Sequence, residues 1–374
     1  MRIRAVVLAG ALAAAVHSSA AAATPGVDAR AYEVVNAATG EVLATRNAGA
    51  RLPMASITKL MTVLVVLERA ELDDVVTVDR DAVGVTGSGV RLRAGERITV
   101  RDLVAAALIQ SANDAAIALA AHVGGGDEDA FVRLMNRKAA QLGLHSTHFE
   151  RADGLDVAGH VSTAHDVNRL AQIAMRKPEI RRVVAVRDAS IAGGRSLHTW
   201  NDLLGTFPGL VGVKTGHTSI AGWCQVAAAR GPGFTIYATI LGSPSRGERN
   251  SDLAELLAFG LARYRLVSVI APERTYATAE LPYGRDPLRL VAMRPVKRPV
   301  LLTRALTERV MAPTAVALPV RKGQRLGEVH VYDRGKLVAS SPLVASRSVE
   351  PPGTAGKVGW YAKRTLHHLG GLFS

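Results

Sequence analysis

The chain of 374 residues contains a single cysteine, Cys224, so no disulfide can form within it. No group of cysteines and histidines has the spacing of a zinc site, and no nucleic-acid-binding motif is present. Aromatic residues make up only 4% of the chain, whereas hydrophobic residues make up 48%. We therefore expect a core built mainly from Ala, Val and Leu, with Cys224 in a buried strand, no bound metal and no nucleic-acid partner.

Acidic residues are fewer than basic ones, which gives a formal net charge of +14. The lysines and arginines are scattered along the chain and form no run. This excess favours attraction to a negatively charged surface, such as a membrane or an anionic polymer. A contribution to solubility alone is the alternative explanation.

The apolar run near the N-terminus, Ala5 to Val16, is too short to span a bilayer. Two arginines precede this run, and small residues follow it through Ala23. This is the pattern of a cleaved export signal, so we expect residues 1–23 to be removed by a cut near Ala22 or Ala23.

Residues 24–265 have the pattern of one large domain. A pair of β-like runs at 31–47 is followed by helical periodicity between 56 and 175, by β runs at 223–241, and by a last helix at 253–264. This order predicts a mixed α/β (α+β) domain whose antiparallel sheet takes strands from both ends of the segment.

Two further segments follow. In residues 266–350, short β-like runs alternate with Pro and Gly, and Asp333-Arg334-Gly335 resembles a hairpin turn, which predicts a small all-β domain for binding or spacing. Residues 351–374 begin with Pro-Pro-Gly and continue as a short basic amphipathic helix. Such a helix is typical of a membrane-interface anchor, although docking on its own protein would give the same pattern.

Three short motifs indicate chemistry: Ser56-Ile57-Thr58-Lys59, Ser111-Ala112-Asn113 and Lys214-Thr215-Gly216. A serine and a lysine three residues apart on a helix lie on one face, within reach of each other. An uncharged amine there can take the proton of the hydroxyl, so Ser56 is the candidate nucleophile and Lys59 the candidate general base. We expect burial and a nearby cation, with Lys214 as the candidate, to lower the pKa of Lys59.

Other residues in or next to these motifs have predicted roles. Ser111 can pass protons between Lys59 and a leaving nitrogen, and the Asn113 amide can hold Lys59 and a substrate carbonyl. The backbone N–H groups of Ser56 and His217 are candidate oxyanion donors. Gly216 leaves room for a substrate backbone along a strand.

Two basic side chains outside the motifs are also candidates for the site. Arg249, in preference to Arg246, is expected to bind a substrate carboxylate in a bidentate manner. His160 lies in a loop before a capped helix, where it can order the rim of the site or assist deacylation; a structural role is equally open.

The three motifs and their contexts, with Met135-Asn136-Arg137-Lys138 and Asp153-Gly154-Leu155-Asp156, resemble the low-molecular-weight penicillin-binding proteins, the serine-type D-alanyl-D-alanine carboxypeptidases. The resemblance covers essentially the whole mature chain. It implies a penicillin-binding, transpeptidase-like catalytic domain without metal or organic cofactor.

The same resemblance implies hydrolysis of the terminal D-Ala–D-Ala bond of peptidoglycan stem peptides through an acyl-enzyme on Ser56. Lys59, Ser111, Asn113 and Lys214 would complete the site, and Thr215 and Arg249 would hold the substrate carboxylate. β-Lactams would acylate Ser56. The implied location is the periplasm, with peripheral attachment to the outer face of the cytoplasmic membrane through the C-terminal helix.

Three alternatives remain open at this stage. A weak serine β-lactamase shares the motifs but needs a carboxylate that activates a deacylating water, and neither Glu150 nor Asp153 stands in a recognisable lactamase motif. A DD-endopeptidase is closer in class, although such relatives usually lack the second domain. A non-catalytic wall-binding protein would not need the intact motif residues.

Overall fold

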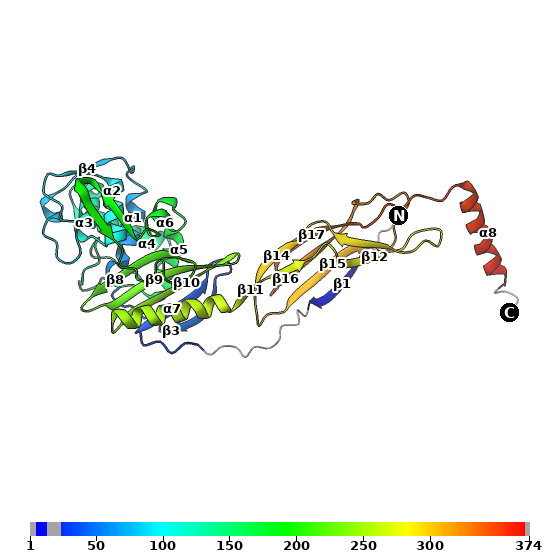
Figure 1. Cartoon of the computed structure of the whole chain (residues 1–374), viewed down its shortest axis with the longest axis horizontal. Coiled ribbons are helices and arrows are strands. Elements are labelled where there is room, and N and C mark those ends of the chain that lie inside the picture. Colours follow the sequence, from blue (N-terminus) through cyan, green and yellow to red (C-terminus); the bar gives the residue numbers. More distant parts are fainter. Residues whose placement is uncertain (1–4, 13–23, 371–374) are drawn as a thin grey trace. The chain divides into compact units, whose positions relative to one another are not determined.

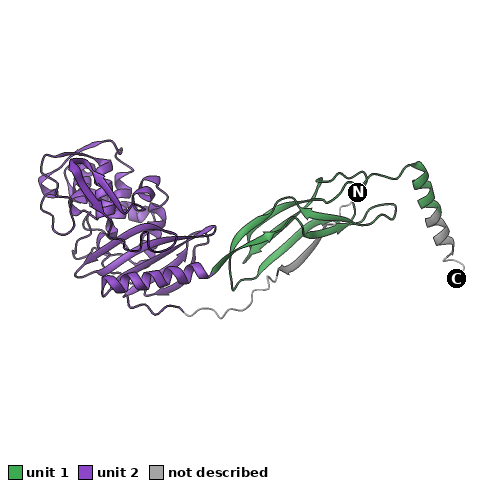
Figure 2. Ribbon diagram, viewed as in Figure 1, with its two compact units in different colours: residues 1–21, 264–374 green, residues 22–263 purple. Residues whose placement is uncertain are grey.

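The computed structural model describes residues 5–12 and 24–370. The chain forms two compact units, one of residues 22–263 and one that combines residues 264–374 with residues 1–21 (Figure 2). The division after Arg263 lies close to the end of the large domain expected from sequence. Each unit has its own hydrophobic core.

The larger unit contains a five-stranded antiparallel sheet with the order β3-β2-β10-β9-β8 (Figure 1). The strands are β2 (Ala31–Asn36), β3 (Glu41–Arg46), β8 (Leu210–Thr218), β9 (Gly222–Gly231) and β10 (Phe234–Ser243). The N-terminal hairpin of β2 and β3 therefore pairs with β10, which follows almost two hundred residues later in the chain. The entropy cost of closing a loop grows only slowly with its length, so a large domain can include such a pairing. The predicted mixed α/β fold is confirmed.

Helices cover both faces of this sheet. On β10, alternate side chains point to opposite faces. Ile236 lies against Gly260 of α7 (Arg246–Ala262), whereas Thr239 donates a hydrogen bond to Asn168 of α5 (Ala164–Ala174). The helices α5 and α7 therefore pack on opposite faces.

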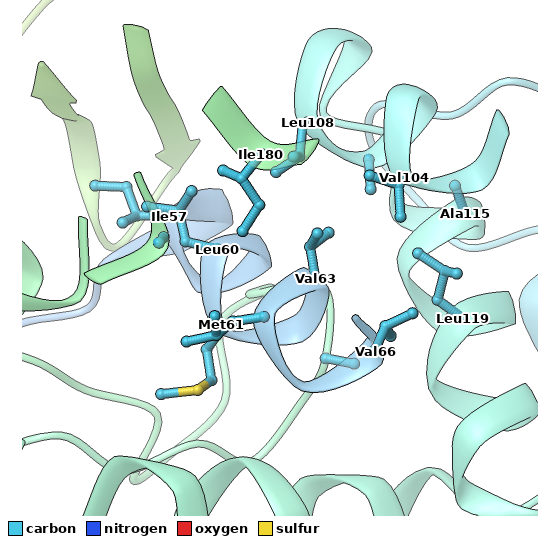
Figure 3. Packing of buried hydrophobic residues seen from close by; sticks show 14 of the residues in the cluster. Ile57, Leu60, Met61, Val63, Val66, Val104, Leu108, Ala115, Leu119 and Ile180 are labelled. Atoms are coloured by element: carbon cyan, nitrogen blue, oxygen red, sulfur yellow. The ribbon is translucent and has the colours of Figure 1, made fainter. Parts of the chain in front are cut away.

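The remaining helices of this unit surround α1 (Lys59–Val66), in which every residue is buried. A 3₁₀ turn, η1 (Ala55–Thr58), leads directly into α1. Figure 3 shows apolar side chains of η1 and α1 among those of the neighbouring helices. These helices and the short strands are α2 (Val100–Ala105), α3 (Asn113–Gly124), α4 (Glu128–Gln141), α6 (Pro178–Val183), β4 (Val75–Thr77), β5 (Arg97–Thr99), β6 (Asp188–Ile191) and β7 (Arg195–His198).

Local capping signals explain where several helices begin. The Thr99 and Thr163 hydroxyls accept hydrogen bonds from the backbone three residues later, at the starts of α2 and α5, as their positions predict. The helix predicted at 253–264 begins earlier, at Arg246, because Ser245 accepts from Glu248 N and caps two polar turns that lack apolar periodicity. The helix that contains Lys59 ends at Val66.

The smaller unit contains a six-stranded sheet, β1-β15-β16-β17-β13-β12, and a two-stranded sheet, β11-β14. Arg334 and Gly335 join β16 to β17 with φ values of 49° and 78°, the signature of a type I′ hairpin. The first strand falls within the predicted export signal, so cleavage there would leave five strands in the large sheet. The bounds are β1 (Ala5–Leu12), β11 (Tyr264–Ile270), β12 (Thr275–Ala279), β13 (Leu288–Ala292), β14 (Val296–Leu301), β15 (Leu306–Pro313), β16 (Arg325–Asp333) and β17 (Lys336–Ala345).

The last helix, α8 (Thr354–Gly370), follows the predicted breaker. The rings of Trp360 and Tyr361 lie 5.6 Å and 6.4 Å from the ring of Tyr283 in the same unit. Val358 and Tyr361 remain 69% and 57% exposed. The predicted apolar positions beyond Ala362 have side chains outside the described residues. Within the described ranges, no helix combines the length and the hydropathy that a membrane crossing requires.

Candidate active site

Ser56 and Lys59 lie on consecutive turns at the start of the buried helix. Ser56 is in η1, and Lys59 is the first residue of α1. The distance between Lys59 Nζ and Ser56 Oγ is 2.8 Å. This is the contact that the three-residue spacing predicts, and it allows direct proton transfer from the hydroxyl to an uncharged amine.

Lys59 is completely buried, and its amine has two further partners. Nζ donates to Asn113 Oδ1 at 2.7 Å and to the backbone oxygen of Asp153 at 2.6 Å. Burial lowers the pKa of Lys59 from 10.5 to about 7, against the opposing effect of Asp153 and Asp114. Arg151 adds to this lowering, whereas the repulsion between Lys59 and Lys214, the cation expected from sequence, lowers the pKa of Lys214.

Ser111 and Lys214 form a second serine–lysine pair. Ser111 has a left-handed backbone (φ 62°) directly after a π-helical turn, and its Oγ lies 2.8 Å from Lys214 Nζ. Burial, Lys59 and Arg249 lower the pKa of Lys214. Asn113 holds Lys59 through Oδ1 while its Nδ2 donates to the backbone oxygen of Thr86 at 2.6 Å.

The third motif, Lys214-Thr215-Gly216, lies on β8, which is an edge strand of the five-stranded sheet. A Cβ on Gly216 would lie 2.9 Å from Met54 O and 3.0 Å from Ser56 N. Only glycine therefore lets β8 approach the turn that contains the serine so closely. His217 follows on the same strand, so both candidate oxyanion donors belong to adjoining segments.

Arg249 lies on α7, close to the same strand. Its guanidinium is 5.5 Å from the centre of the Trp223 ring, and Trp223 stacks on His217. Arg249 is buried, and burial lowers its pKa to about 10. Its Nη2 lies 3.1 Å from an oxygen of Asp202, which no sequence pattern indicated as part of the site.

Arg246, the alternative candidate, is far more exposed than Arg249, with 40% of its side chain accessible against 1%. Its guanidinium binds both carboxylate oxygens of Asp202 and lies over the exposed ring of Trp200. The effect of Arg249 on the pKa of Lys214 has no counterpart from Arg246. The position of Arg249 therefore fits the carboxylate-binding role better.

His160 contacts the first motif through the Thr58 side chain, and no hydrogen bond joins it to Ser56 or Lys59. It is buried beneath η1, with Nε2 at 2.7 Å from Thr58 Oγ1, and Glu150 N donates to its Nδ1 at 3.1 Å. Burial lowers its pKa to about 4. Because both ring nitrogens are engaged within the protein, this position does not fit the role in deacylation that the sequence left open, and it fits a role in ordering the site.

The loop that precedes His160 adds residues to the site that the motif analysis did not assign. Asp153 supplies a backbone oxygen to Lys59, while its carboxylate binds the Arg151 guanidinium through two hydrogen bonds. Gly154 has φ +85°, and a Cβ on it would lie 2.2 Å from Ala55 O. In the sequence, only the segment Asp153-Gly154-Leu155-Asp156, which is part of the family resemblance, indicated that this loop belongs to the site.

Comparisons with known proteins agree with this geometry. Residues 18–245 match the family model described as Peptidase_S11, D-alanyl-D-alanine carboxypeptidase. The chain belongs to the S11 family of D-alanyl-D-alanine carboxypeptidases. It is therefore a serine-type carboxypeptidase, which the motifs also indicate.

Individual relatives extend the match over both units. D-alanyl-D-alanine carboxypeptidase DacC from Escherichia coli (strain K12) is 32% identical over 368 residues, which cover 94% of this chain and 92% of that protein. DacF from Bacillus subtilis (strain 168) is 28% identical and covers 87% of both. The crystal structure of penicillin binding protein 5 from Haemophilus influenzae aligns with a TM-score of 0.64 at 26% identity, over 87% of this chain and 99% of that one.

The site also bears on the β-lactamase alternative for this carboxypeptidase. Glu150 has its side chain on the exposed His148, and the Asp153 carboxylate is bound by Arg151, which contributes to lowering its pKa. Neither carboxylate is in contact with Ser56 or Lys59 through its side chain. The family match and this arrangement both favour the carboxypeptidase.

Proposed function

We propose that this carboxypeptidase removes the terminal D-alanine from peptidoglycan pentapeptides through an acyl-enzyme on Ser56. The observation that supports the proposal best is the 2.8 Å contact between Ser56 Oγ and Lys59 Nζ, together with the lowered pKa of Lys59. An amine with a pKa of about 7 is partly uncharged at neutral pH and can accept the serine proton.

In the proposed acylation, the Lys59 amine takes the Ser56 proton as Oγ attacks the carbonyl carbon of the penultimate D-alanine. The N–H groups of Ser56 and His217 stabilise the oxyanion. The C–N bond then breaks, and the proton passes to the leaving nitrogen through Ser111, which bonds Lys214. Water completes the cycle by hydrolysing the ester, so that free D-alanine and a shortened peptide are the products.

Substrate binding is assigned to β8 and its neighbours. The peptide backbone lies along β8, which is an edge strand of the sheet. Asn113 contacts the substrate carbonyl, and Lys214, Thr215 and Arg249 bind the terminal carboxylate.

A β-lactam presents a similar carbonyl and carboxylate, so we expect it to acylate Ser56 and to form a stable adduct. Removing the terminal D-alanine removes the donor for cross-linking and so limits cross-linking of the wall.

The proposed location is the periplasm, at the outer face of the cytoplasmic membrane, after removal of residues 1–23. The distribution of charge supports attachment to an anionic surface. Residues 264–350 contain 15 Lys and Arg against 7 Asp and Glu, whereas residues 24–263 contain 26 against 25. The positive charge is thus concentrated in the smaller unit, next to the amphipathic helix at 351–374, which we propose as the anchor.

One experiment tests nucleophile and reaction together. Purified enzyme is incubated with a pentapeptide and, separately, with a fluorescent penicillin, and both mixtures are analysed by mass spectrometry. We expect loss of a single alanine from the peptide and a penicillin adduct on Ser56. Ser56→Ala should abolish both, while Ser340→Ala, an exposed serine of the other unit, should leave both intact. Labelling that persists in Ser56→Ala would show that another residue is the nucleophile.

A further inference from the structure

The residue before the nucleophile is held in an unusual conformation. Ala55 has φ 50°, a left-handed backbone that residues with a Cβ rarely adopt. Such a conformation persists only where surrounding groups hold it in place. The Ala55 carbonyl accepts a hydrogen bond from Thr58 Oγ1 at 2.8 Å, so the Thr58 hydroxyl is one of the groups that hold it.

The hydrogen bonds fix the roles of the atoms around Thr58. A hydroxyl has one hydrogen, and Thr58 donates it to Ala55 O. At its 2.7 Å contact with His160 Nε2, the hydroxyl must then accept, so Nε2 bears a hydrogen. Nδ1 accepts from Glu150 N and bears none. One tautomer of the neutral imidazole satisfies all three hydrogen bonds.

The same histidine closes the loop that contacts the catalytic pair. Its bond to Glu150 N joins the two ends of residues 150–160. Between these ends, Asp153 O accepts from Lys59 Nζ, and Gly154 lies against Ala55 O. His160 therefore connects two parts of the site, the turn that contains Ser56 and the loop that holds Lys59.

We propose that His160 is a positioning residue that acts through Thr58: the neutral imidazole donates to the Thr58 hydroxyl, which holds the Ala55 carbonyl and so directs Ser56 towards Lys59. This inference rests on the proposed roles of Ser56 and Lys59. It assigns His160 no contact with substrate and no proton transfer. A general base for deacylation would need a free nitrogen near the reacting water, and both nitrogens of His160 are occupied.

The charged groups around the ring fit this role. Arg151, His148, Asp153 and Asp156 act on the imidazole with mixed signs, and burial keeps it neutral. The ring therefore retains its donor at the pH values where Lys59 titrates. Replacing His160 should change the rate of acylation without changing the shape of its pH dependence.

The test compares His160→Gln with His160→Leu. Glutamine keeps a donor and an acceptor, whereas leucine keeps neither. We expect His160→Leu to lower kcat for pentapeptide hydrolysis and the rate of penicillin labelling about tenfold, the loss typical of one buried hydrogen bond, with KM little changed. His160→Gln should recover most of that rate. His148→Gln, a change of an exposed histidine near the same loop, is the matched control and should behave as the parent enzyme.

A second pair of variants tests the connection through Thr58. Thr58→Val removes the hydroxyl and should match His160→Leu, whereas Thr58→Ser should stay close to the parent. The double variant His160→Leu/Thr58→Val should lose no more than either single variant, because both interrupt one chain of hydrogen bonds. Should His160→Leu fail to fold, the comparison of Thr58→Val with Thr58→Ser tests the same connection.

Three results would overturn the proposal. The first is normal labelling by His160→Leu or Thr58→Val. The second is accumulation of acyl-enzyme in His160→Gln, which would assign the histidine to deacylation. The third is losses that multiply in the double variant. If the parent enzyme itself were not labelled at Ser56, the proposed function would fail instead, so the two failures are distinguishable.

Discussion

The pH dependence of acylation is the most direct consequence of the burial of Lys59. Moving its pKa from 10.5 to about 7 corresponds to about 5 kcal/mol of disfavour for the ammonium form inside the protein. At pH 7, an ordinary lysine is about 0.03% uncharged, whereas Lys59 is about half uncharged. Burial therefore increases the fraction of competent base by roughly a thousandfold.

The sign of the dependence follows from the chemistry. A protonated amine cannot take the Ser56 proton, so the rate should fall about tenfold per pH unit below pH 7 and level off above it. The assay is the rate of labelling by a fluorescent penicillin between pH 5 and 9.5, with circular dichroism as the control for folding. A rate that climbs through pH 9 would mean an ordinary lysine. A flat profile would mean that Lys59 is not the base.

Arg151→Gln perturbs the same equilibrium from outside the catalytic pair. The change removes a cation that lowers the pKa of Lys59 and leaves the Asp153 carboxylate, which raises it, without its partner. Both effects favour the ammonium, so the midpoint of the profile should move to higher pH by about one unit. Arg133→Gln, which removes an exposed arginine paired with Asp127, is the matched control. A midpoint that stays or moves to lower pH would refute the reasoning.

Three further changes test other parts of the structure. Gly154→Ala places a Cβ against Ala55 O and should reduce both thermal stability and penicillin labelling; Gly84→Ala, with a similar φ but open space around it, separates the cost of the clash from that of the backbone and should label normally. Arg249→Ala should weaken cleavage of peptides with a free carboxylate at least tenfold more than acylation by an ester that lacks one, so equal losses would contradict its assignment. Deleting residues 354–374 should release the protein from membrane fractions with pentapeptide hydrolysis intact, and a truncated protein that remains bound would exclude the anchor.

Sequence patterns predicted those parts of the fold that depend on neighbouring residues. The cap of the helix after His160, at Thr163, and the turn at Arg334 and Gly335 each involve contacts within four residues, so the local sequence contains the whole signal. The start of α7 was not predicted, although its capping pair, Ser245 and Glu248, is equally local. Its first two turns are polar, and the apolar periodicity that indicates a helix begins only at Leu253.

The two serine–lysine pairs show the same limit at the site. Ser56 and Lys59 are three residues apart, so helix geometry alone predicts their contact. Ser111 and Lys214 are 103 residues apart, and only the packing of an edge strand against a left-handed turn brings them to 2.8 Å. The charge around Lys59 depends on packing in the same way. Arg151 acts on it because Asp153, a residue of the same loop, gives Lys59 its backbone oxygen and gives Arg151 its carboxylate. Motif spacing has no information about that shared residue, so the sequence indicated Lys214, which does interact with Lys59, but could not indicate Arg151.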